Sequence, residues 1–308
     1  MNSSNAISDT VFVTKRSIFR NIASISAFLG KGNHFQLCGF NGASEMVSET
    51  PSKRIVILTI AVAAVIITAT ISFLPRQPSP LDGVRVSIYT DRGVSAASRK
   101  AVEHMFLWMG ADVSIIESED ISEGILNTTD ILVMPGGCWC EQRIGILTEE
   151  MKSIIRNYIA NGGAYFGIDG GASYATNYRL NIFHGRLVAD ALGATDFVTE
   201  LEINCNLTSP DLSQEPDSYM VFYEASGYFE AEDMTGIYTI ATYANTSLPC
   251  MIAFKYGNGT VFMSSPHPEY EEDSNRDGTD MYDLQVDPDS EWDLMLKICQ
   301  WLLDESGL

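Results

Sequence analysis

The chain has 308 residues, of which 45% are hydrophobic and 19% are charged. This composition excludes a disordered or collagen-like protein and allows one large or two modest domains. The chain carries 40 acidic and 19 basic residues, for a net charge of -21. Because nucleic-acid binding depends on a basic surface, we expect no nucleic-acid partner.

The acidity is confined to the part of the chain beyond residue 74. Residues 1–54 hold six basic and three acidic residues and residues 55–74 hold none, so subtraction leaves 13 basic and 37 acidic residues for the remainder. Segment 1–54 is rich in Ser and Asn, which predicts a floppy or weakly helical tail.

Residues 55–74 read IVILTIAVAAVIITATISFL, with only Thr and Ser as polar members. At about 1.5 Å per residue, a helix of this length spans a hydrocarbon core of roughly 30 Å. A buried core helix is the weaker alternative, since such helices are shorter and usually have a polar stripe. Lys53 and Arg54 precede the run and Arg76 alone follows closely, so the positive-inside rule places the N-terminus in the cytoplasm.

These features predict a single-pass protein of the cell membrane with an extracytoplasmic C-terminal domain. Its parts are a cytoplasmic tail (1–54), a transmembrane helix (55–74), a linker (75–82) and the exported domain (83–308). A cleaved signal peptide is the alternative if translation starts at Met46, and the domain would still be exported. Four N-x-[ST] sequons agree with export and predict a glycoprotein, at Asn127, Asn206, Asn245 and Asn258.

Strand-like and helix-like patterns alternate after the linker. Helical spacing of apolar residues follows the potential cap Ser95 and ends at Gly110, and it recurs over 151–159 before a Gly pair. Short apolar runs typical of buried strands cover 84–90, 112–117, 130–134 and 164–168. This order predicts an α/β fold with a flavodoxin-like parallel sheet and helices on both faces.

The C-terminal half adds four expected strands, at 219–225, 236–243, 251–256 and 260–264. The last two flank a Gly-Asn-Gly turn, which indicates a hairpin. A final helix is expected to begin after the cap Ser290 and to cover the sheet.

Three motifs fall at the edge of the predicted sheet where parallel strands end and ligands bind. Pro-Gly-Gly occupies 135–137. Gly-Ile-Asp-Gly-Gly at 167–171 has the G-x-Nuc-x-G shape of a nucleophile elbow, with Asp169 at its centre. Ser-Pro-His-Pro-Glu at 265–269 places His267 two residues from Glu269, a carboxylate that can orient an imidazole.

In this order, PGG, YFGIDGGASYA and KYGNGTVFMSSPHPE resemble the class I glutamine amidotransferase-like superfamily, in the branch named for the N-terminal domain of biotin-protein ligases. The resemblance runs from about Val84 to Leu303. It implies a Cys-His-Glu triad, with Asp169 at the nucleophile position, His267 as base and Glu269 as its orienter. It also implies an oxyanion hole built from backbone amides around Gly136, Gly137 and Gly170.

The sequence departs from the family pattern at the nucleophile, because Asp169 stands where the family has Cys. We therefore do not expect glutamine hydrolysis through a thiolate. We also do not expect biotin transfer, because the sequence shows no ligase domain. Asp169 is open to three interpretations. In the first, Asp169 is a relic of the active site and forms an ion pair with His267 in a ligand pocket. In the second, it is a carboxylate nucleophile that forms an ester. In the third, a thiol of Cys138 or Cys140 faces the same cleft and replaces the missing nucleophile.

Cys138 and Cys140 also have a plainer interpretation. Neighbouring cysteines in an exported loop are more often disulfide partners than nucleophiles, and Cys205 and Cys250 are the candidate partners. The C-x-C pair alone is a poor zinc signature.

A second motif predicts a calcium site. Asp273, Asn275 and Asp277, followed by Gly278, match the first half of a calcium-binding loop, although Leu284 stands where a bidentate Glu is expected. A solvated acidic loop is the alternative.

The sequence thus favours a non-catalytic domain that binds or senses a small polar ligand at the former active site. A hydrolase of an amide or ester, using Asp169 or a nearby Cys with His267 and Glu269, is the second hypothesis. A scaffold for other exported proteins is the third.

Overall fold

The computed structural model describes residues 78–138, 146–177, 179–271 and 274–307. The chain divides into two units, Met1–Pro75 and Arg76–Leu308, and all described residues belong to the second. The tail and transmembrane helix predicted for 1–54 and 55–74 lie outside the described residues. Among the described residues, no helix is long and apolar enough to cross a membrane.

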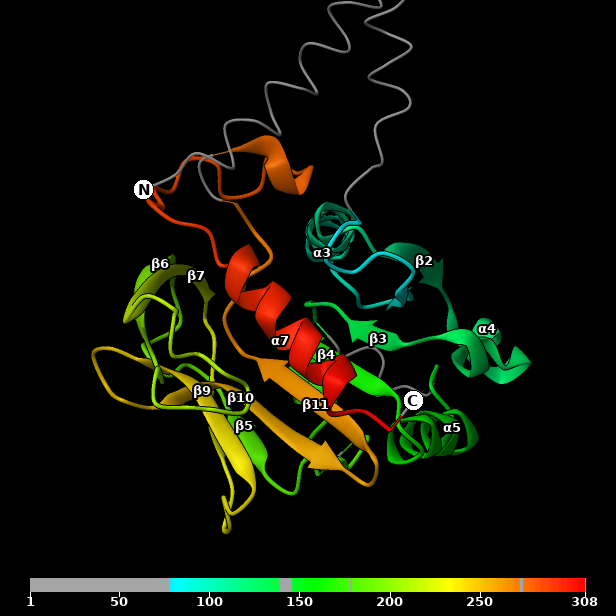
Figure 1. The fold of residues 1–308 in the computed structure, drawn as a ribbon. Coiled ribbons are helices and arrows are strands. Elements are labelled where there is room, and N and C mark those ends of the chain that lie inside the picture. Colours follow the sequence, from blue (N-terminus) through cyan, green and yellow to red (C-terminus); the bar gives the residue numbers. More distant parts are fainter. Residues whose placement is uncertain (1–77, 139–145, 178, 272–273, 308) are drawn as a thin grey trace, which may run out of the picture. The chain divides into compact units, whose positions relative to one another are not determined.

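The first half of this unit alternates strands and helices, as the apolar patterns predict (Figure 1). Its elements are β1 (Arg85–Tyr89), α3 (Ala96–Met109), β2 (Asp112–Ile116), α4 (Ser118–Glu123), a 3-10 helix (Ile125–Thr128), β3 (Ile131–Met134), α5 (Glu149–Ala160), β4 (Ala164–Ile168) and α6 (Gly170–Tyr174). Ser95 caps α3 by accepting a hydrogen bond from the Ser98 amide, and Gly110 ends it at φ 88°. A side chain is rarely tolerated at that angle, so the cap and the glycine set the ends of α3.

The second half contains the expected strands together with three that the sequence did not indicate, β5, β6 and β8. Its elements are β5 (Arg186–Val188), β6 (Asp196–Ile203), β7 (Ser218–Glu224), β8 (Tyr228–Glu230), β9 (Ile237–Tyr243), β10 (Pro249–Tyr256), β11 (Gly259–Ser264) and α7 (Trp292–Asp304). Helix α7 begins with Glu291, not Ser290, at its N-cap position. The Ser290 hydroxyl still accepts a 3.4 Å hydrogen bond from the Trp292 amide at the start of α7, and it donates a hydrogen bond to Glu271.

Nine strands form one mixed sheet in the order β2-β1-β3-β4-β11-β10-β9-β6-β7. The pairs from β2 to β11 are parallel, and those from β11 through β10, β9 and β6 to β7 are antiparallel. The parallel prediction is therefore confirmed for the first five strands, whereas the rest form an antiparallel extension. The remaining pair, β5 and β8, forms a small separate sheet.

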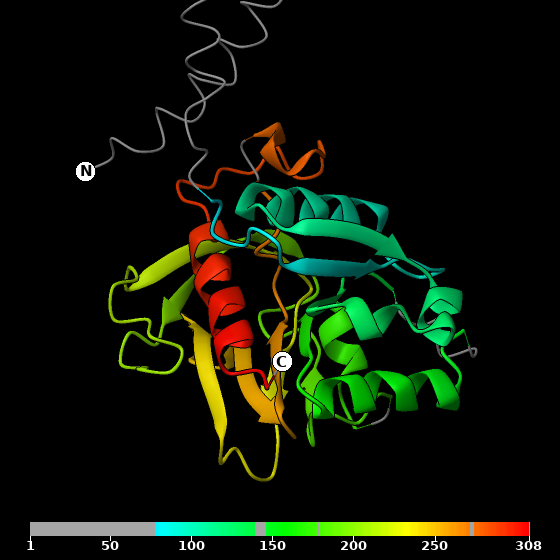
Figure 2. The same cartoon turned by 45° about the vertical axis from the view of Figure 1, so that its right-hand side comes forward.

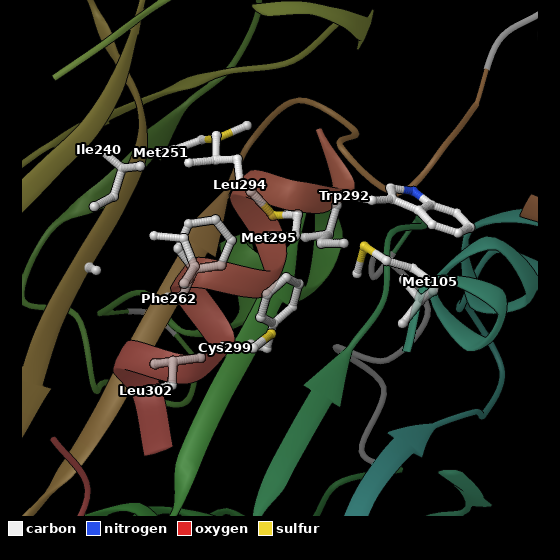
Figure 3. Close-up of a cluster of buried hydrophobic side chains, with 14 of the residues drawn as sticks. Met105, Ile240, Met251, Phe262, Trp292, Leu294, Met295, Cys299 and Leu302 are labelled. Atoms are coloured by element: carbon white, nitrogen blue, oxygen red, sulfur yellow. The ribbon is translucent and has the colours of Figure 1, made fainter. Parts of the chain in front are cut away.

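Helices cover both faces of the sheet. On one face α3 and α7 contribute to a core that includes Met105, Trp292 and Leu302, and on the other α5 and α6 pack over Tyr165. Helix α7, drawn in red, lies over the middle strands in both views (Figure 2). Figure 3 shows its side chains packed beside Phe262 of β11. Burial of each large apolar side chain contributes roughly 1.5–3 kcal/mol, which explains how an apolar α7 is held without a strong N-terminal cap.

Candidate functional site

The three motifs meet because they follow three neighbouring strands. Strands β3, β4 and β11 are adjacent and parallel, so their carboxyl ends lie at one edge of the sheet. The Pro-Gly-Gly segment follows β3, Asp169 follows β4, and the segment containing His267 follows β11. The sheet topology thus explains why residues almost 100 positions apart in sequence share one site.

Asp169 occupies a strained turn between β4 and α6. Its backbone has φ 45° and ψ -108°, a conformation unusual for a residue with a side chain. The turn is closed by hydrogen bonds from the Asp169 amide to the Ser264 carbonyl and from the Ser173 amide to the Asp169 carbonyl, each 2.8 Å long. A Cβ on Gly171 would lie 1.9 Å from the Met134 carbonyl oxygen, so this position admits only glycine. The backbone therefore has the form predicted for a nucleophile elbow.

The Asp169 carboxylate is held by the Pro-Gly-Gly loop. Its Oδ2 accepts a hydrogen bond of 2.9 Å from the Gly137 amide. Burial raises the pKa of Asp169 above its ordinary value, while nearby His267 and hydrogen bonds from the Gly137 and Gly170 amides oppose that rise. Two of the three amides implied as an oxyanion hole, those of Gly137 and Gly170, thus interact with the Asp169 side chain.

Gly136 has a different partner from the one implied by the resemblance. Its amide donates to the Ser98 hydroxyl at 2.8 Å, which commits it away from an oxyanion. A Cβ on Gly136 would come within 3.0 Å of His267 Cε1 and 3.3 Å of Asp169 Oδ2. Gly136 therefore lies beside both side chains and lets them approach.

His267 and Glu269 form the expected pair. His267 Nδ1 lies 3.0 Å from Glu269 Oε1, and both side chains are buried. The same Glu269 oxygen accepts a 2.6 Å hydrogen bond from the Ser98 hydroxyl. Ser98 thus connects Glu269 to the Gly136 amide, so helix α3, the Pro-Gly-Gly loop and the segment after β11 hold the imidazole together.

Glu224 is a further site residue that sequence reasoning missed. Its Oε2 lies 3.4 Å from His267 Nε2, so Glu224, not Asp169, is the second carboxylate at ion-pair distance from the imidazole. The expected direct ion pair between Asp169 and His267 is replaced by this arrangement. Glu224 ends β7, at the far end of the sheet order, and an isolated bridge between Phe222 and His267 brings it to the site.

The imidazole is surrounded by negative charge. Burial lowers the pKa of His267, but Glu269, Asp169 and Glu224 together outweigh burial and raise it to about 9. The three carboxylates therefore favour the imidazolium form of His267. Its Nε2 is buried and has no hydrogen-bond partner among the described residues, although Glu224 is within ion-pair distance.

A cavity of about 200 Å³ opens onto the Asp169 side of the site. Polar and charged groups line part of it, including Asp169, Ser173 and Arg179, and Cys138 faces the same cavity. Arg179 donates a hydrogen bond to the Ser173 hydroxyl at 2.9 Å. A larger, open groove of about 600 Å³ lies by the Arg186–Glu230 ion pair of β5 and β8, away from these motifs.

The predicted disulfides to Cys205 and Cys250 are wrong, because both residues are thiols. The Cys250 thiol is buried and donates to the Ala241 carbonyl, while the Cys205 thiol contacts carbonyl oxygens before β7. Cys140 lies outside the described residues, so its predicted role is not addressed.

The segment that carries the predicted calcium motif packs against α3. Asn275–Asp277 form a 3-10 helix, and the Asp277 carboxylate accepts hydrogen bonds from the Glu271 and Thr279 amides. Asp273 lies outside the described residues. A different group, Asp287, Asp289 and Glu291, brings carboxylates within 4.8 Å of one another. Calcium binding by the motif stays a prediction.

Comparisons with known proteins agree with this architecture. A ThuA-like protein from Bacteroides uniformis is similar in structure, with a TM-score of 0.51 and 14% identity over 76% of this chain and 97% of that one. A glutamine amidotransferase from Thermotoga maritima has a TM-score of 0.49 and 16% identity, over 72% and 96% of the two chains. The similarity to the ThuA-like protein shows a shared α/β fold.

The family resemblance, predicted for Val84 to Leu303, is confirmed for the first part of that range. Residues 84–184 match the family model described as "Biotin-protein ligase, N terminal". The matched segment includes the Pro-Gly-Gly loop and Asp169, and it ends before His267 and Glu269. No curated protein matches the chain.

Proposed function

We propose that this chain is a membrane-anchored protein whose extracytoplasmic domain binds a small polar ligand at an altered nucleophile elbow. The observation that supports this most directly is the Asp169 carboxylate, which is held by the Gly137 amide at the wall of a small cavity. The elbow of the fold is kept, and a carboxyl group takes the place of a reactive thiol.

The same contact argues against glutamine hydrolysis. Thiol amidotransferase chemistry needs a thiolate and open amides that stabilise the oxyanion formed on the substrate. Here Asp169 supplies a carboxylate and Gly137 already donates to it. A substrate carbonyl would have to displace that hydrogen bond.

The cavity suits a ligand that carries polar groups of both signs. Asp169 offers a carboxylate on one part of the wall and Arg179 a guanidinium on another, with the Ser173 hydroxyl between them in the network. A cavity of about 200 Å³ can hold only a ligand that is slightly larger than a small amino acid.

Export is supported by the surface of the domain. The asparagines of all four sequons, Asn127, Asn206, Asn245 and Asn258, are exposed, as glycosylation requires. Together with the apolar segment 55–74, this supports a cell-membrane protein with its C-terminal domain outside.

Thermal unfolding with a panel of small amino acids and hydroxy acids tests the binding proposal. We expect at least one compound to raise the Tm of the wild-type chain and to have no effect on Asp169→Ala, because the variant lacks the carboxylate at the cavity wall. Equal stabilisation of both proteins would contradict binding at this site. A scaffold for exported proteins would tolerate both Asp169→Ala and His267→Ala without loss of partner binding.

A second candidate function is hydrolysis with Asp169 as nucleophile, and one observation favours it. The backbone of Asp169 is strained at a φ of 45°. Such strain persists only where the surrounding structure fixes the residue, and strained residues cluster at active sites. A hydrolase loses its activity on His267→Ala, whereas reversible binding mainly depends on Asp169.

A further inference from the structure

The two nitrogens of the His267 imidazole face different carboxylates. Nδ1 lies 3.0 Å from Glu269 Oε1, and Nε2 lies 3.4 Å from Glu224 Oε2. The first contact fixes the tautomer. The Gly136 amide donates to the Ser98 hydroxyl, so the single Ser98 proton is donated to Glu269 Oε1. Because that oxygen is an acceptor, Nδ1 carries the imidazole hydrogen, and the lone pair of neutral His267 lies on Nε2.

The Nε2 atom of neutral His267 is therefore an acceptor that faces a second acceptor. It is buried and has no hydrogen-bond partner in the part of the chain that the structure describes. Two acceptors repel each other unless a positive group lies between them, and Asp169 and Glu269 add negative charge around the imidazole. The pair of Nε2 and Glu224 Oε2 thus requires a proton or a metal cation between the two atoms.

The distance between these two atoms distinguishes a metal ion from a proton. A hydrogen bond between an imidazolium and a carboxylate has its heavy atoms about 2.7–2.9 Å apart, which is shorter than the observed 3.4 Å. A zinc ion forms bonds of about 2.0–2.1 Å to an imidazole nitrogen and about 2.0–2.2 Å to a carboxylate oxygen. Two such bonds span 3.4 Å at an angle of about 110°, which is close to the tetrahedral angle that zinc prefers.

Glu224 is held beside the imidazole from two sides. The His267 amide donates to the Phe222 carbonyl at 3.0 Å, and side chains two positions apart on a strand share a face, so Glu224 is directed toward His267. The Tyr282 hydroxyl hydrogen-bonds to Glu224, and the Tyr282 ring stacks on Phe222 at 3.6 Å. Tyr282 has a φ of 67°, a strained conformation for a residue with a bulky side chain. The contact between Glu224 and His267 is therefore fixed by the surrounding structure.

We propose that His267 Nε2 and Glu224 bind a divalent metal ion of the zinc class. One imidazole and one carboxylate suit zinc better than calcium or magnesium, which prefer oxygen ligands. Glu269 then corresponds to the outer carboxylate that typically orients a histidine ligand through its other nitrogen. The Glu224 side chain is 45% exposed and that of His267 is 2% exposed, so the ion enters from the Glu224 side and water completes its coordination there. The proposal goes beyond ligand binding at the Asp169 cavity and does not depend on it.

Zinc titration of the metal-free, full-length chain in detergent, against a chromophoric chelator, tests the proposal. We expect a zinc ion at this site that a large excess of Ca²⁺ or Mg²⁺ does not displace. Loss of even an outer partner of a metal ligand typically weakens binding about 10–100-fold, so Glu224→Gln should lower the zinc affinity at least about tenfold. Glu200→Gln is the matched control, because Glu200 is an exposed carboxylate on the neighbouring strand β6, and it should bind zinc as the wild type does.

Cobalt(II) reports on the donor atoms. Co²⁺ in a four-coordinate site absorbs visible light more strongly than hydrated Co²⁺, and we expect this absorption in the wild type and in Glu200→Gln but not in His267→Gln. Equal zinc affinity of Glu224→Gln and the wild type would overturn the proposal, because the ion would then be bound elsewhere, for example by the acidic group at 287–291. Zinc binding no tighter than calcium binding would also overturn it. Both results leave ligand binding at the Asp169 cavity intact.

Discussion

The Gly137 amide donates a hydrogen bond to Asp169 Oδ2 at 2.9 Å, so a backbone group that could serve a substrate oxyanion instead holds a side chain of the protein. This one contact links the Pro-Gly-Gly loop after β3 to the elbow after β4. It also shows where the Asp169 carboxylate lies relative to the Pro-Gly-Gly loop.

Stability should fall as the pH rises from 6.5 to 9. The pKa of His267 is raised from 6.5 to about 9 by Glu269, Asp169 and Glu224. A raised imidazole pKa stabilises the folded state fully below the unfolded pKa, and this stabilisation is lost as the pH passes the folded pKa. We expect a loss on the order of 3 kcal/mol across this range. Urea unfolding at several pH values measures it, and the same loss in His267→Gln would show that another group is responsible.

Ser98→Ala should destabilise the domain by about 1–3 kcal/mol, because a buried donor and a buried acceptor lose their partner. Ser98 donates to Glu269 and accepts from the Gly136 amide. Ser122→Ala is the control, since its hydroxyl donates to the Ser118 carbonyl within its own helix. Equal effects of the two substitutions on urea unfolding would contradict a role for Ser98 in joining the site.

Gly136→Ala should disturb the site more than the fold. The new Cβ would press on His267, Ser98 and Asp169 at 3.0–3.3 Å, and such overpacking typically costs about 1–3 kcal/mol. NMR titration of the imidazole should then give a pKa below the wild-type value, because the carboxylates that raise it are displaced. An unchanged His267 titration would show that the loop yields without moving the site.

Arg276 should hold the segment 274–290 against helices α3 and α7. Its guanidinium lies 4.7 Å from the Trp108 ring and 4.2 Å from the Trp292 ring, and it pairs with Glu271. Arg276→Lys keeps the charge but loses the planar stacking, so we expect a loss of about 1 kcal/mol and faster hydrogen exchange over 274–290. Exchange at the wild-type rate in Arg276→Ala would contradict this role.

Much of the parallel half of the fold could be predicted from local signals. Ser95 and Gly110 mark the ends of α3, and the apolar run 164–168 coincides with β4. The short strands β5 and β8 were missed because three residues carry too little periodicity. The Ser290 cap was placed one residue early, since Glu291 holds the N-cap position, although the Ser290 hydroxyl does accept a hydrogen bond from the Trp292 amide.

The site could be predicted as far as it depends on consecutive residues. The elbow and the pair of His267 and Glu269 are local motifs, and the structure brings them together. Glu224 depends on the path of β7 across the antiparallel extension, which no local pattern reveals. Ser98 was seen only as part of a helix, since its contact with Glu269 spans 171 positions.

The most direct test of the altered elbow is chemical rescue of Asp169→Gly with formate. If the Asp169 carboxylate fills a cradle of backbone amides, its removal opens that cradle to an external carboxylate, and glycine accepts the positive φ. We predict that formate raises the Tm of Asp169→Gly in a saturable manner and leaves the wild-type Tm unchanged. The same response in both proteins, or none in Asp169→Gly, would contradict the account.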